Sequence, residues 1–364
     1  MTKFLDLQKQ YGAIKNEIDN AISSVITDSA FVGGKYVQEF EVAFATYQQA
    51  EHCIGVGNGT DAIEILIEAL ALPSGSEIIV PANSFIASSE AVSRTGHRVV
   101  FADVDPHTYT LDVDDVAKRI TAKTVAIMAV HLYGHPCDMD ALGRLADEYG
   151  LAIIEDCAQA HGAEYKGRRV GTFGAGGTFS FYPGKNLGAY GDGGAILTND
   201  AELALQCRRI ANHGRTKKYE HLFEGRNSRL DGLQAAILTV KLKHLDSWIE
   251  TRGRVAALYL EKLRELPGLI LPSLPKKGRH AFHLFVVRTE DRDALAAHLH
   301  MQGIQTGVHY PVALPKLAAY AYIGQAEEPL RANFLDSQLL SLPMGEHLGD
   351  DDVRHVIDAV VSFF

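Results

Sequence analysis

The sequence predicts an α/β protein with a large, mostly parallel β-sheet and a smaller α/β domain at its C-terminal end. Three observations predict this class. Between positions 53 and 156, short continuous apolar runs alternate with helical patterns, as expected for parallel strands covered by helices on both faces. The chain has 364 residues, more than one hydrophobic core usually serves. Proline and glycine cluster between 267 and 278, which is the clearest change in composition.

The elements of the large domain follow in order. An amphipathic helical pattern over 8–25 ends before the Phe-Val-Gly-Gly stretch at 31–34. Strand patterns then occupy 54–56, 77–80, 98–101, 124–130 and 151–155, and helical patterns occupy 61–72, 84–94, 113–120 and 138–149. Two more strands are expected at 178–181 and 194–198. Together they predict a doubly covered sheet.

The C-terminal part begins after long helical patterns over 201–212 and 231–266. Behind the proline- and glycine-rich stretch we expect a strand, a helix, a short strand and two further helices; the first three are placed at 281–288, 292–301 and 306–309. We predict a large domain over 1–250 and a small domain over 251–364. The N-terminal helix is free to pack on the small domain.

Composition excludes several classes of function. The formal net charge is −10 and no basic run exceeds two residues, so we expect no nucleic-acid partner. No signal-peptide pattern is present, and no apolar run reaches the roughly 18 residues of a membrane span. We therefore expect a cytoplasmic protein that makes no membrane contact. The cysteines are widely spaced and form no CxxC, which indicates reduced, buried thiols; they are Cys53, Cys137, Cys157 and Cys207. His298 and His300 do not share a helix face, and we expect no metal.

The segment 178–194 places Lys185 among apolar and glycine residues, just after an expected strand. Burial disfavours the charged amine and lowers the pKa of a lysine. The neutral amine is the form that attacks a carbonyl and forms a Schiff base. Taken alone, the segment is also compatible with a solvated lysine in a surface turn.

A second segment supports the chemical interpretation. Asp156 follows the strand pattern at 151–155, and ligands of open α/β sheets bind beyond the carboxyl ends of the strands. A carboxylate there can pair with a pyridinium nitrogen and keep the ring an electron sink. A capping or salt-bridging aspartate is the alternative. Because Glu155 and Asp156 are adjacent, at most one of them should point into the site.

The glycine-rich turn at 55–59 lies between a strand and a helix, where backbone N–H groups can bind a phosphate. It could also be a degenerate dinucleotide-binding loop. That interpretation requires an acidic residue at the end of the next strand, but Glu77 opens that strand and Pro81 follows it. The nicotinamide-binding hypothesis therefore fails.

Three more side chains could contact such a ligand. Phe85 could stack on a flat ring, Ser180 could bind the phosphate, and Gln159 could bind a ring hydroxyl. Each also has an ordinary structural explanation. In one register, however, the chain contains Gly-Asn-Gly-Thr, Asn-Ser-Phe, His-Leu-Tyr-Gly, Glu-Asp-Cys-Ala-Gln-Ala-His-Gly and Ser-Phe-Tyr-Pro-Gly-Lys, ending at Lys185.

This order of motifs resembles the DegT/DnrJ/EryC1/StrS family of nucleotide-sugar aminotransferases, which depend on pyridoxal 5'-phosphate (PLP) and have the aspartate-aminotransferase fold. The resemblance extends from Asp6 to the last helix. It implies that Lys185 forms the internal aldimine and then moves the proton, and that Asp156 binds the pyridine nitrogen. Gln159 would bind the ring 3-hydroxyl and Phe85 would stack on the ring.

The resemblance also implies a phosphate site and a homodimer with shared active sites. The phosphate would be held by Gly59, Thr60 and Ser180, and completed by an asparagine of the partner subunit that is matched here by Asn227. The residues placed near the sugar nucleotide are Phe31, Tyr182, Arg215, His309 and Tyr310. The stretch 212–229 is expected to be a mobile active-site loop, and Arg215 is one of its cations that could contact the diphosphate.

The implied reaction moves an amino group from glutamate to a keto-sugar nucleotide. Relatives with histidine in place of the Schiff-base lysine are dehydratases, and Lys185 therefore favours transamination. The Pro-Gly-Lys form ending at Lys185 looks like the branch that aminates C3 of dTDP-3-keto-6-deoxyhexoses. The alternatives are a C4-aminotransferase acting on a UDP- or dTDP-4-keto sugar, a PLP-dependent sugar dehydratase, and a non-catalytic regulatory protein with the same fold.

Overall fold

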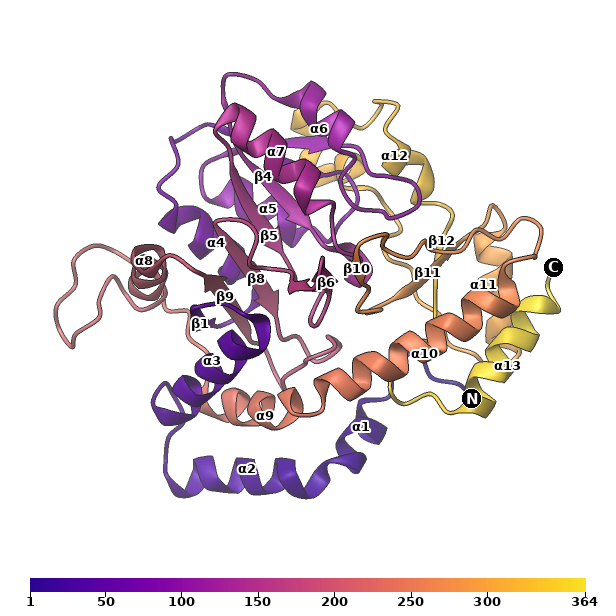
Figure 1. Cartoon of the computed structure of the whole chain (residues 1–364), viewed down its shortest axis with the longest axis horizontal. Helices are drawn as coiled ribbons and strands as arrows, with labels where there is room; N and C mark the ends of the chain where they lie inside the picture. The colour runs from indigo at the N-terminus through magenta and orange to yellow at the C-terminus, as the bar shows by residue number, and fades with distance from the viewer.

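The computed structural model describes all 364 residues. Its centre is a seven-stranded sheet in the order β1-β9-β8-β5-β4-β2-β3 (Figure 1). The strands are β1 (His52–Val56), β2 (Glu77–Pro81), β3 (Arg98–Ala102), β4 (Thr124–Val130), β5 (Ala152–Asp156), β8 (Gly176–Ser180) and β9 (Gly194–Thr198). Only β9 runs against the others, since it pairs antiparallel with both β1 and β8. The predicted mostly parallel α/β sheet is therefore confirmed.

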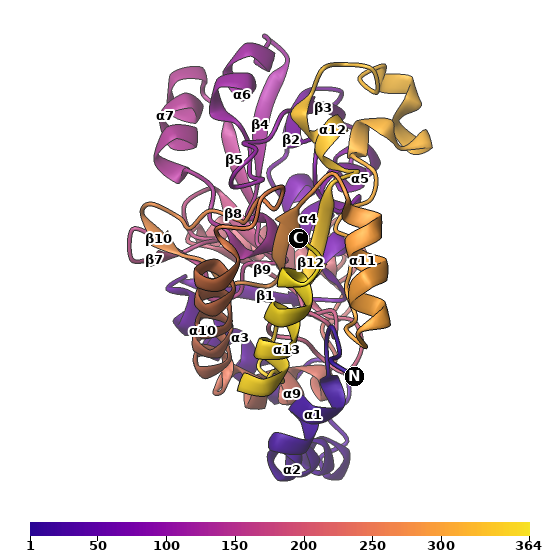
Figure 2. The ribbon, with the colours of Figure 1, turned by 90° about the vertical axis from the view of Figure 1, so that its right-hand side faces the viewer.

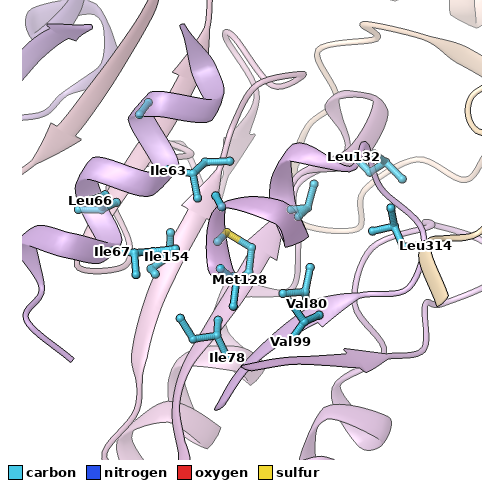
Figure 3. Packing of buried hydrophobic residues seen from close by; sticks show 14 of the residues in the cluster. Ile63, Leu66, Ile67, Ile78, Val80, Val99, Met128, Leu132, Ile154 and Leu314 are labelled. Carbon is cyan, nitrogen blue, oxygen red and sulfur yellow. The ribbon is translucent and has the colours of Figure 1, made fainter. Parts of the chain in front are cut away.

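Helices cover both faces of this sheet. One face packs against α4 (Gly59–Ala69), α5 (Ala87–Arg94) and α8 (Ala201–Ala211). The other face packs against α3 (Lys35–Gln48), α6 (Val113–Arg119), α7 (Met139–Tyr149) and α9 (Gly232–Leu242). Along β2, Ile78 and Val80 belong to the first core and Ile79 to the second, because successive side chains of a strand point to opposite faces. Figure 3 shows the first core.

A second, smaller sheet unit lies at the C-terminal end (Figures 1 and 2). Here β11 (Phe285–Arg288) pairs antiparallel with β12 (Leu339–Leu342), and the pair shares a core with α10 (Leu245–Leu263), α11 (Arg292–Met301) and α13 (Asp350–Val361). The helix α10 contributes Ile249 to the core of the large sheet and Val255 to this one. One helix thus spans position 250, where the sequence predicts the boundary between the two domains. That boundary stays a prediction.

The remaining elements are short. A three-stranded sheet has the order β10-β6-β7, formed by β6 (Glu164–Tyr165), β7 (Arg168–Arg169) and β10 (Gly278–Arg279). The 3-10 helices are η1 (Leu132–Gly134), η2 (Leu314–Lys316) and η3 (Ala318–Ile323), and α12 (Arg331–Leu335) completes the set with the N-terminal helices α1 (Leu7–Ala13) and α2 (Lys15–Thr27). None of the helices is both long enough and apolar enough to cross a bilayer.

Two helices expected as continuous are divided. The 8–25 pattern breaks at Ile14, between α1 and α2. The first half contacts the C-terminal part, where Lys9 Nζ donates to the His347 carbonyl at 2.7 Å, whereas α2 packs on α9. The 231–266 pattern likewise breaks between α9 and α10. Periodicity reports which residues are buried but not a change of packing partner.

Two expectations for the C-terminal part were wrong. The stretch 306–309 forms no strand; Gly307 only makes an isolated bridge with Ser341. Conversely, β12 lies within a region expected to hold only helices. All four β12 residues are buried, and a four-residue apolar run cannot be assigned to strand or helix by its period.

Candidate active site

A cavity of about 920 Å³ lies beyond the carboxyl ends of β2, β4, β5 and β8, where C-terminal residues close it. Its wall includes Gly59, Thr60, Phe85, Asp156, Gln159, Ser180, Tyr182, Lys185, His309 and Tyr310. These are all the predicted site residues except three. The cavity also occupies the position at which open α/β sheets bind ligands.

One end of the cavity is a cradle for an anion. Asn58 caps α4 by accepting from the Asp61 N–H at 2.8 Å, and Gly59 is the first residue of the helix. A Cβ on Gly59 would lie 2.7 Å from Ser180 Cβ, so only glycine lets the end of β8 approach this closely. The free N–H groups and the positive end of the helix dipole favour a phosphate here.

Lys185 extends from a closed turn that follows β8. The Lys185 N–H donates to the Tyr182 carbonyl and the Ala189 N–H donates to the Phe181 carbonyl, both at 2.8 Å. From outside the turn, Lys241 Nζ of α9 donates to the Gly188 carbonyl at 2.7 Å. These bonds fix the backbone from which the reactive side chain projects.

The turn is also held by the C-terminal part. Asn186, the neighbour of Lys185, donates from Nδ2 to the Ala281 carbonyl at 2.9 Å. Its Oδ1 lies 3.2 Å from His283 Nδ1. Both ends of the Asn186 amide are therefore used to join the lysine turn to the residues that close the cavity.

Burial lowers the pKa of Lys185 to about 8, and the charge of Asp156 opposes that shift. About a tenth of the amine is therefore neutral at pH 7, far more than for a solvated lysine. Three histidines face the same region, and burial followed by the Lys185 charge lowers the pKa of each: to about 3 for His161, to about 4 for His309, and well below its usual value for His283. The three imidazoles therefore stay neutral near pH 7, and Asp156 is the charged group that raises the pKa of the amine.

Asp156 is the last residue of β5 and is only 5% exposed. Its Oδ1 accepts from the Ala158 N–H at 3.0 Å and its Oδ2 accepts from Ser88 Oγ at 2.7 Å. Each carboxylate oxygen has two lone pairs, so acceptor capacity remains toward the cavity. The carboxylate is thus oriented by fixed donors and open to a cationic nitrogen.

The adjacent Glu155 points to the opposite face and is fully buried. His131 Nε2 donates to it at 3.0 Å, and its oxygens also accept from the N–H groups of Gly171, Phe173 and Gly174. Burial alone would raise the pKa of Glu155, but these donors hold it below its usual value. The potential metal-ligand atoms of His131, Glu155 and Cys157 lie within 4.8 Å of one another, yet the carboxylate already accepts a hydrogen bond from the imidazole. This cluster is a structural network.

Gln159 is held in one amide orientation. Its Oε1 accepts from the Tyr133 N–H at 2.7 Å, and its Nε2 donates to the Tyr310 hydroxyl at 2.9 Å. The donor end of the amide therefore faces the cavity. The Tyr310 ring lies 5.8 Å from that of Phe85, centroid to centroid. The two rings supply an apolar surface and Gln159 supplies a hydrogen-bond donor. Together they are suited to a flat, hydroxylated heterocycle.

Three predicted residues are not brought to this cavity. Phe31 is 50% exposed, Asn227 is exposed, and Arg215 is partly exposed; none lines the cavity. The neighbour of Asn227, Arg226, forms ion pairs with Glu64 and Glu68 of α4. Asn227 is thereby fixed on the outer surface of the chain that contains it.

Sequence reasoning missed several residues of the wall. Phe4 and Leu5 line the cavity, and the Phe4 ring stacks on His309 at a centroid distance of 5.7 Å. The N-terminal segment reaches this place because Thr2 hydrogen-bonds to Gly303 at 2.9 Å. No local sequence pattern predicts this contact. Arg252 and Met344 join the wall in the same way, through tertiary packing.

Comparison with known proteins agrees with the geometry. The model of the DegT/DnrJ/EryC1/StrS aminotransferase family matches residues 12–361. A dTDP-3-amino-3,4,6-trideoxy-alpha-D-glucose transaminase of Streptomyces venezuelae is 48% identical, over 98% of this chain and 94% of its own length. A dTDP-3-amino-3,6-dideoxy-alpha-D-galactopyranose transaminase of Aneurinibacillus thermoaerophilus is 46% identical, over 99% of both chains.

Among solved structures, that of S. venezuelae DesV in complex with a ketimine intermediate superimposes with a TM-score of 0.96. The two chains are 46% identical, and the match covers 99% of this chain and 97% of DesV. The likeness therefore extends through the large sheet, the C-terminal unit and the cavity between them.

Proposed function

The chain belongs to the DegT/DnrJ/EryC1/StrS aminotransferase family, and we propose that it transfers the amino group of glutamate to C3 of a dTDP-3-keto-6-deoxyhexose with PLP as cofactor. The observation that supports this most directly is the single cavity that unites Lys185, Asp156 and the anion cradle of α4. The names of the two relatives support C3 of a dTDP sugar as the position that receives nitrogen.

The residues of the cavity fit this cofactor. Gly59 leaves room where a Cβ would collide with Ser180, which keeps the helix N-terminus open to the phosphate; Thr60 and Ser180 would add hydroxyl donors. Phe85 would cover the ring, and Gln159 Nε2 would donate to its 3-hydroxyl. When bound, PLP supplies an electron sink for a carbanion next to nitrogen. Asp156 would hold the proton on the pyridine nitrogen that this chemistry requires.

Lys185 would perform the proton transfers. Its Nζ would be the group that holds the cofactor at the aldehyde carbon. As a free amine, Lys185 Nζ would accept the proton from the glutamate Cα and deliver a proton within the same cavity. In the second half-reaction it would move protons in the reverse direction while the sugar is aminated at C3. The low pKa of Lys185 suits it for both directions.

The sugar nucleotide would lie toward Tyr182, His309 and Tyr310. Its diphosphate requires cations, but the two arginines of the wall are already paired: Arg94 with Glu64 at 2.7 Å and Arg252 with Glu346 at 3.1 Å. We propose that a second copy of the chain supplies Arg215 for the diphosphate and Asn227 for the cofactor phosphate, with Phe31 also near the nucleotide. The functional unit would be a homodimer with shared sites.

Gly184 lies next to Lys185 in the turn that follows β8, and its packing bears on how a substrate would reach the amine. A Cβ there would meet Leu5 Cδ2 at 3.5 Å and Tyr182 Cε1 at 3.7 Å, which are ordinary contacts. Local packing therefore does not require glycine at this position. The missing side chain instead leaves space beside Lys185 between Leu5 and Tyr182, where the sugar ring would enter.

The test is a two-step reaction followed by absorption and mass spectrometry. Purified protein with PLP should absorb in the visible, lose that band with glutamate and regain it with a dTDP-3-keto-6-deoxyhexose. The product should be the 3-amino sugar. A panel that includes dTDP-4-keto, UDP-3-keto and UDP-4-keto sugars distinguishes the alternatives. Exclusive amination of a 4-keto sugar, loss of water in place of amination, or no response to glutamate would each overturn the proposal.

A further inference from the structure

Two buried hydroxyls stand behind the Asp156 carboxylate. Ser88 Oγ, in the first turn of α5, donates to Asp156 Oδ2 at 2.7 Å. Ser84 Oγ, in the loop between β2 and α5, lies 2.7 Å from Ser88 Oγ. Ser84 is 3% exposed and Ser88 is 1% exposed. The two side chains and the carboxylate therefore form a chain of hydrogen bonds that water does not reach freely.

The direction of each bond follows from the number of protons. An ionised carboxylate can only accept, so the single hydroxyl proton of Ser88 is committed to Asp156. The proton between the two serines must then come from Ser84. Each bond polarises the next, and the one to the carboxylate is charge-assisted, which makes it about twice as strong as a neutral bond.

We propose that Ser88 is a positioning residue for Asp156, supported by Ser84, and that this pair holds the carboxylate toward the pyridine nitrogen of the cofactor. The inference rests on the proposed function, because it assigns these residues to the site of that reaction. With Ser88 on Oδ2 and the Ala158 N–H on Oδ1, both oxygens are fixed. Rotation of the carboxylate would break one of these bonds.

The neighbouring residue provides a matched control. Ser89 is fully buried on the same helix, but its hydroxyl donates to the Ile86 carbonyl at 3.0 Å and makes no hydrogen bond to Asp156. Ser89→Ala and Ser88→Ala delete the same atom from adjacent buried positions. Only the second deletion removes a donor from the carboxylate.

The experiment compares the holoenzyme with Ser88→Ala, Ser84→Ala and Ser89→Ala, using PLP with an isotopically labelled pyridine nitrogen. The nuclear magnetic resonance of that nitrogen reports whether it is protonated. We expect Ser88→Ala to lose the pyridinium signal at lower pH than the parent and to slow the glutamate half-reaction about tenfold or more. Ser84→Ala should slow it about threefold, and Ser89→Ala should leave both readouts unchanged.

Thermal unfolding and cofactor content identify variants that fail to fold. Should Ser88→Ala be one of them, Ser88→Cys keeps the volume with a weaker donor and should show an intermediate nitrogen titration, as should Ser84→Ala. A parent-like nitrogen titration in these folded variants, or an equal shift in Ser89→Ala, would overturn the inference alone. Failure of the parent protein to bind PLP or react with glutamate would instead overturn the proposed function and the inference with it.

Discussion

The proposed site has two regions that are built differently: the base of the cavity, with Lys185, Asp156 and Gln159, and the outer approach, with Phe31, Arg215 and Asn227. At the base, Asp156 and Gln159 are each held by two hydrogen bonds from the same chain. At the outer approach, Phe31 and Asn227 are exposed and lie away from the cavity. One chain therefore orients the groups proposed to bind the cofactor ring, whereas the groups proposed to bind the diphosphate and to complete the phosphate site would come from a second copy.

Replacing Lys185 tests the base of the cavity with the largest expected effect. Lys185→Ala should lower turnover by at least about a thousandfold, because it removes both the nucleophile and the proton carrier. Steady-state assays with glutamate and the keto sugar would measure this. Lys262→Ala is the control, since Lys262 is exposed and pairs only with its neighbour Glu261. Turnover of Lys185→Ala within tenfold of the parent would remove this lysine from the mechanism.

Asp156→Asn tests the second fixed group at the base. The substitution keeps the shape but removes the negative charge that holds the pyridine proton, and we expect the glutamate half-reaction to slow about a hundredfold. Rapid-mixing absorption measures that step without the sugar. Asp351→Asn, on the exposed start of α13, should react at the parental rate. Equal rates for both variants would show that another residue contacts the nitrogen.

The outer approach is tested by complementation between subunits. Asn227→Asp places a negative charge against the proposed phosphate, and we expect activity to fall about thirtyfold. Subunits of Asn227→Asp and Lys185→Ala, unfolded and refolded together, should recover about a quarter of the parental activity. Half of the dimers would be mixed, and each mixed dimer would contain one intact site. The two variants refolded separately are the controls.

No recovery on mixing, with mixed dimers demonstrated by mass, would place the whole site within one chain. Such a result would erase the difference between the base and the outer approach.

The same difference explains how much the sequence predicts. The α/β class and the family were predicted and are confirmed, because strand and helix periods and short motifs are local signals. Several of the residues that reached the cavity lie at strand ends or in glycine turns, as Asp156 and Gly59 do. Their roles stay predictions.

What the sequence does not predict depends on distant contacts. Phe4 enters the cavity wall through pairing of the N-terminal segment with Gly303, and Ser88 meets Asp156 across 68 positions of chain. The strands β6, β7 and β10 have two residues each, too few to show a period. The breaks between α1 and α2 and between α9 and α10 reflect changes of packing partner. The hydrophobic pattern does not indicate with which element a helix packs.

The pH dependence of cofactor uptake tests the base of the cavity with the smallest effect. Because burial lowers the pKa of Lys185 to about 8, the neutral amine increases as pH rises through that value and is nearly complete one unit above it. Uptake of PLP by the cofactor-free protein should therefore accelerate about tenfold between one unit below and one unit above the pKa. The growth of Schiff-base absorption with time measures the rate. Asp156 raises the pKa of Lys185 through its charge, so in Asp156→Asn the midpoint should move to lower pH. A midpoint that stays near the ordinary lysine value of about 10.4 would mean that the amine is solvated. The base of the cavity would then resemble the outer approach in leaving its functional groups exposed to water.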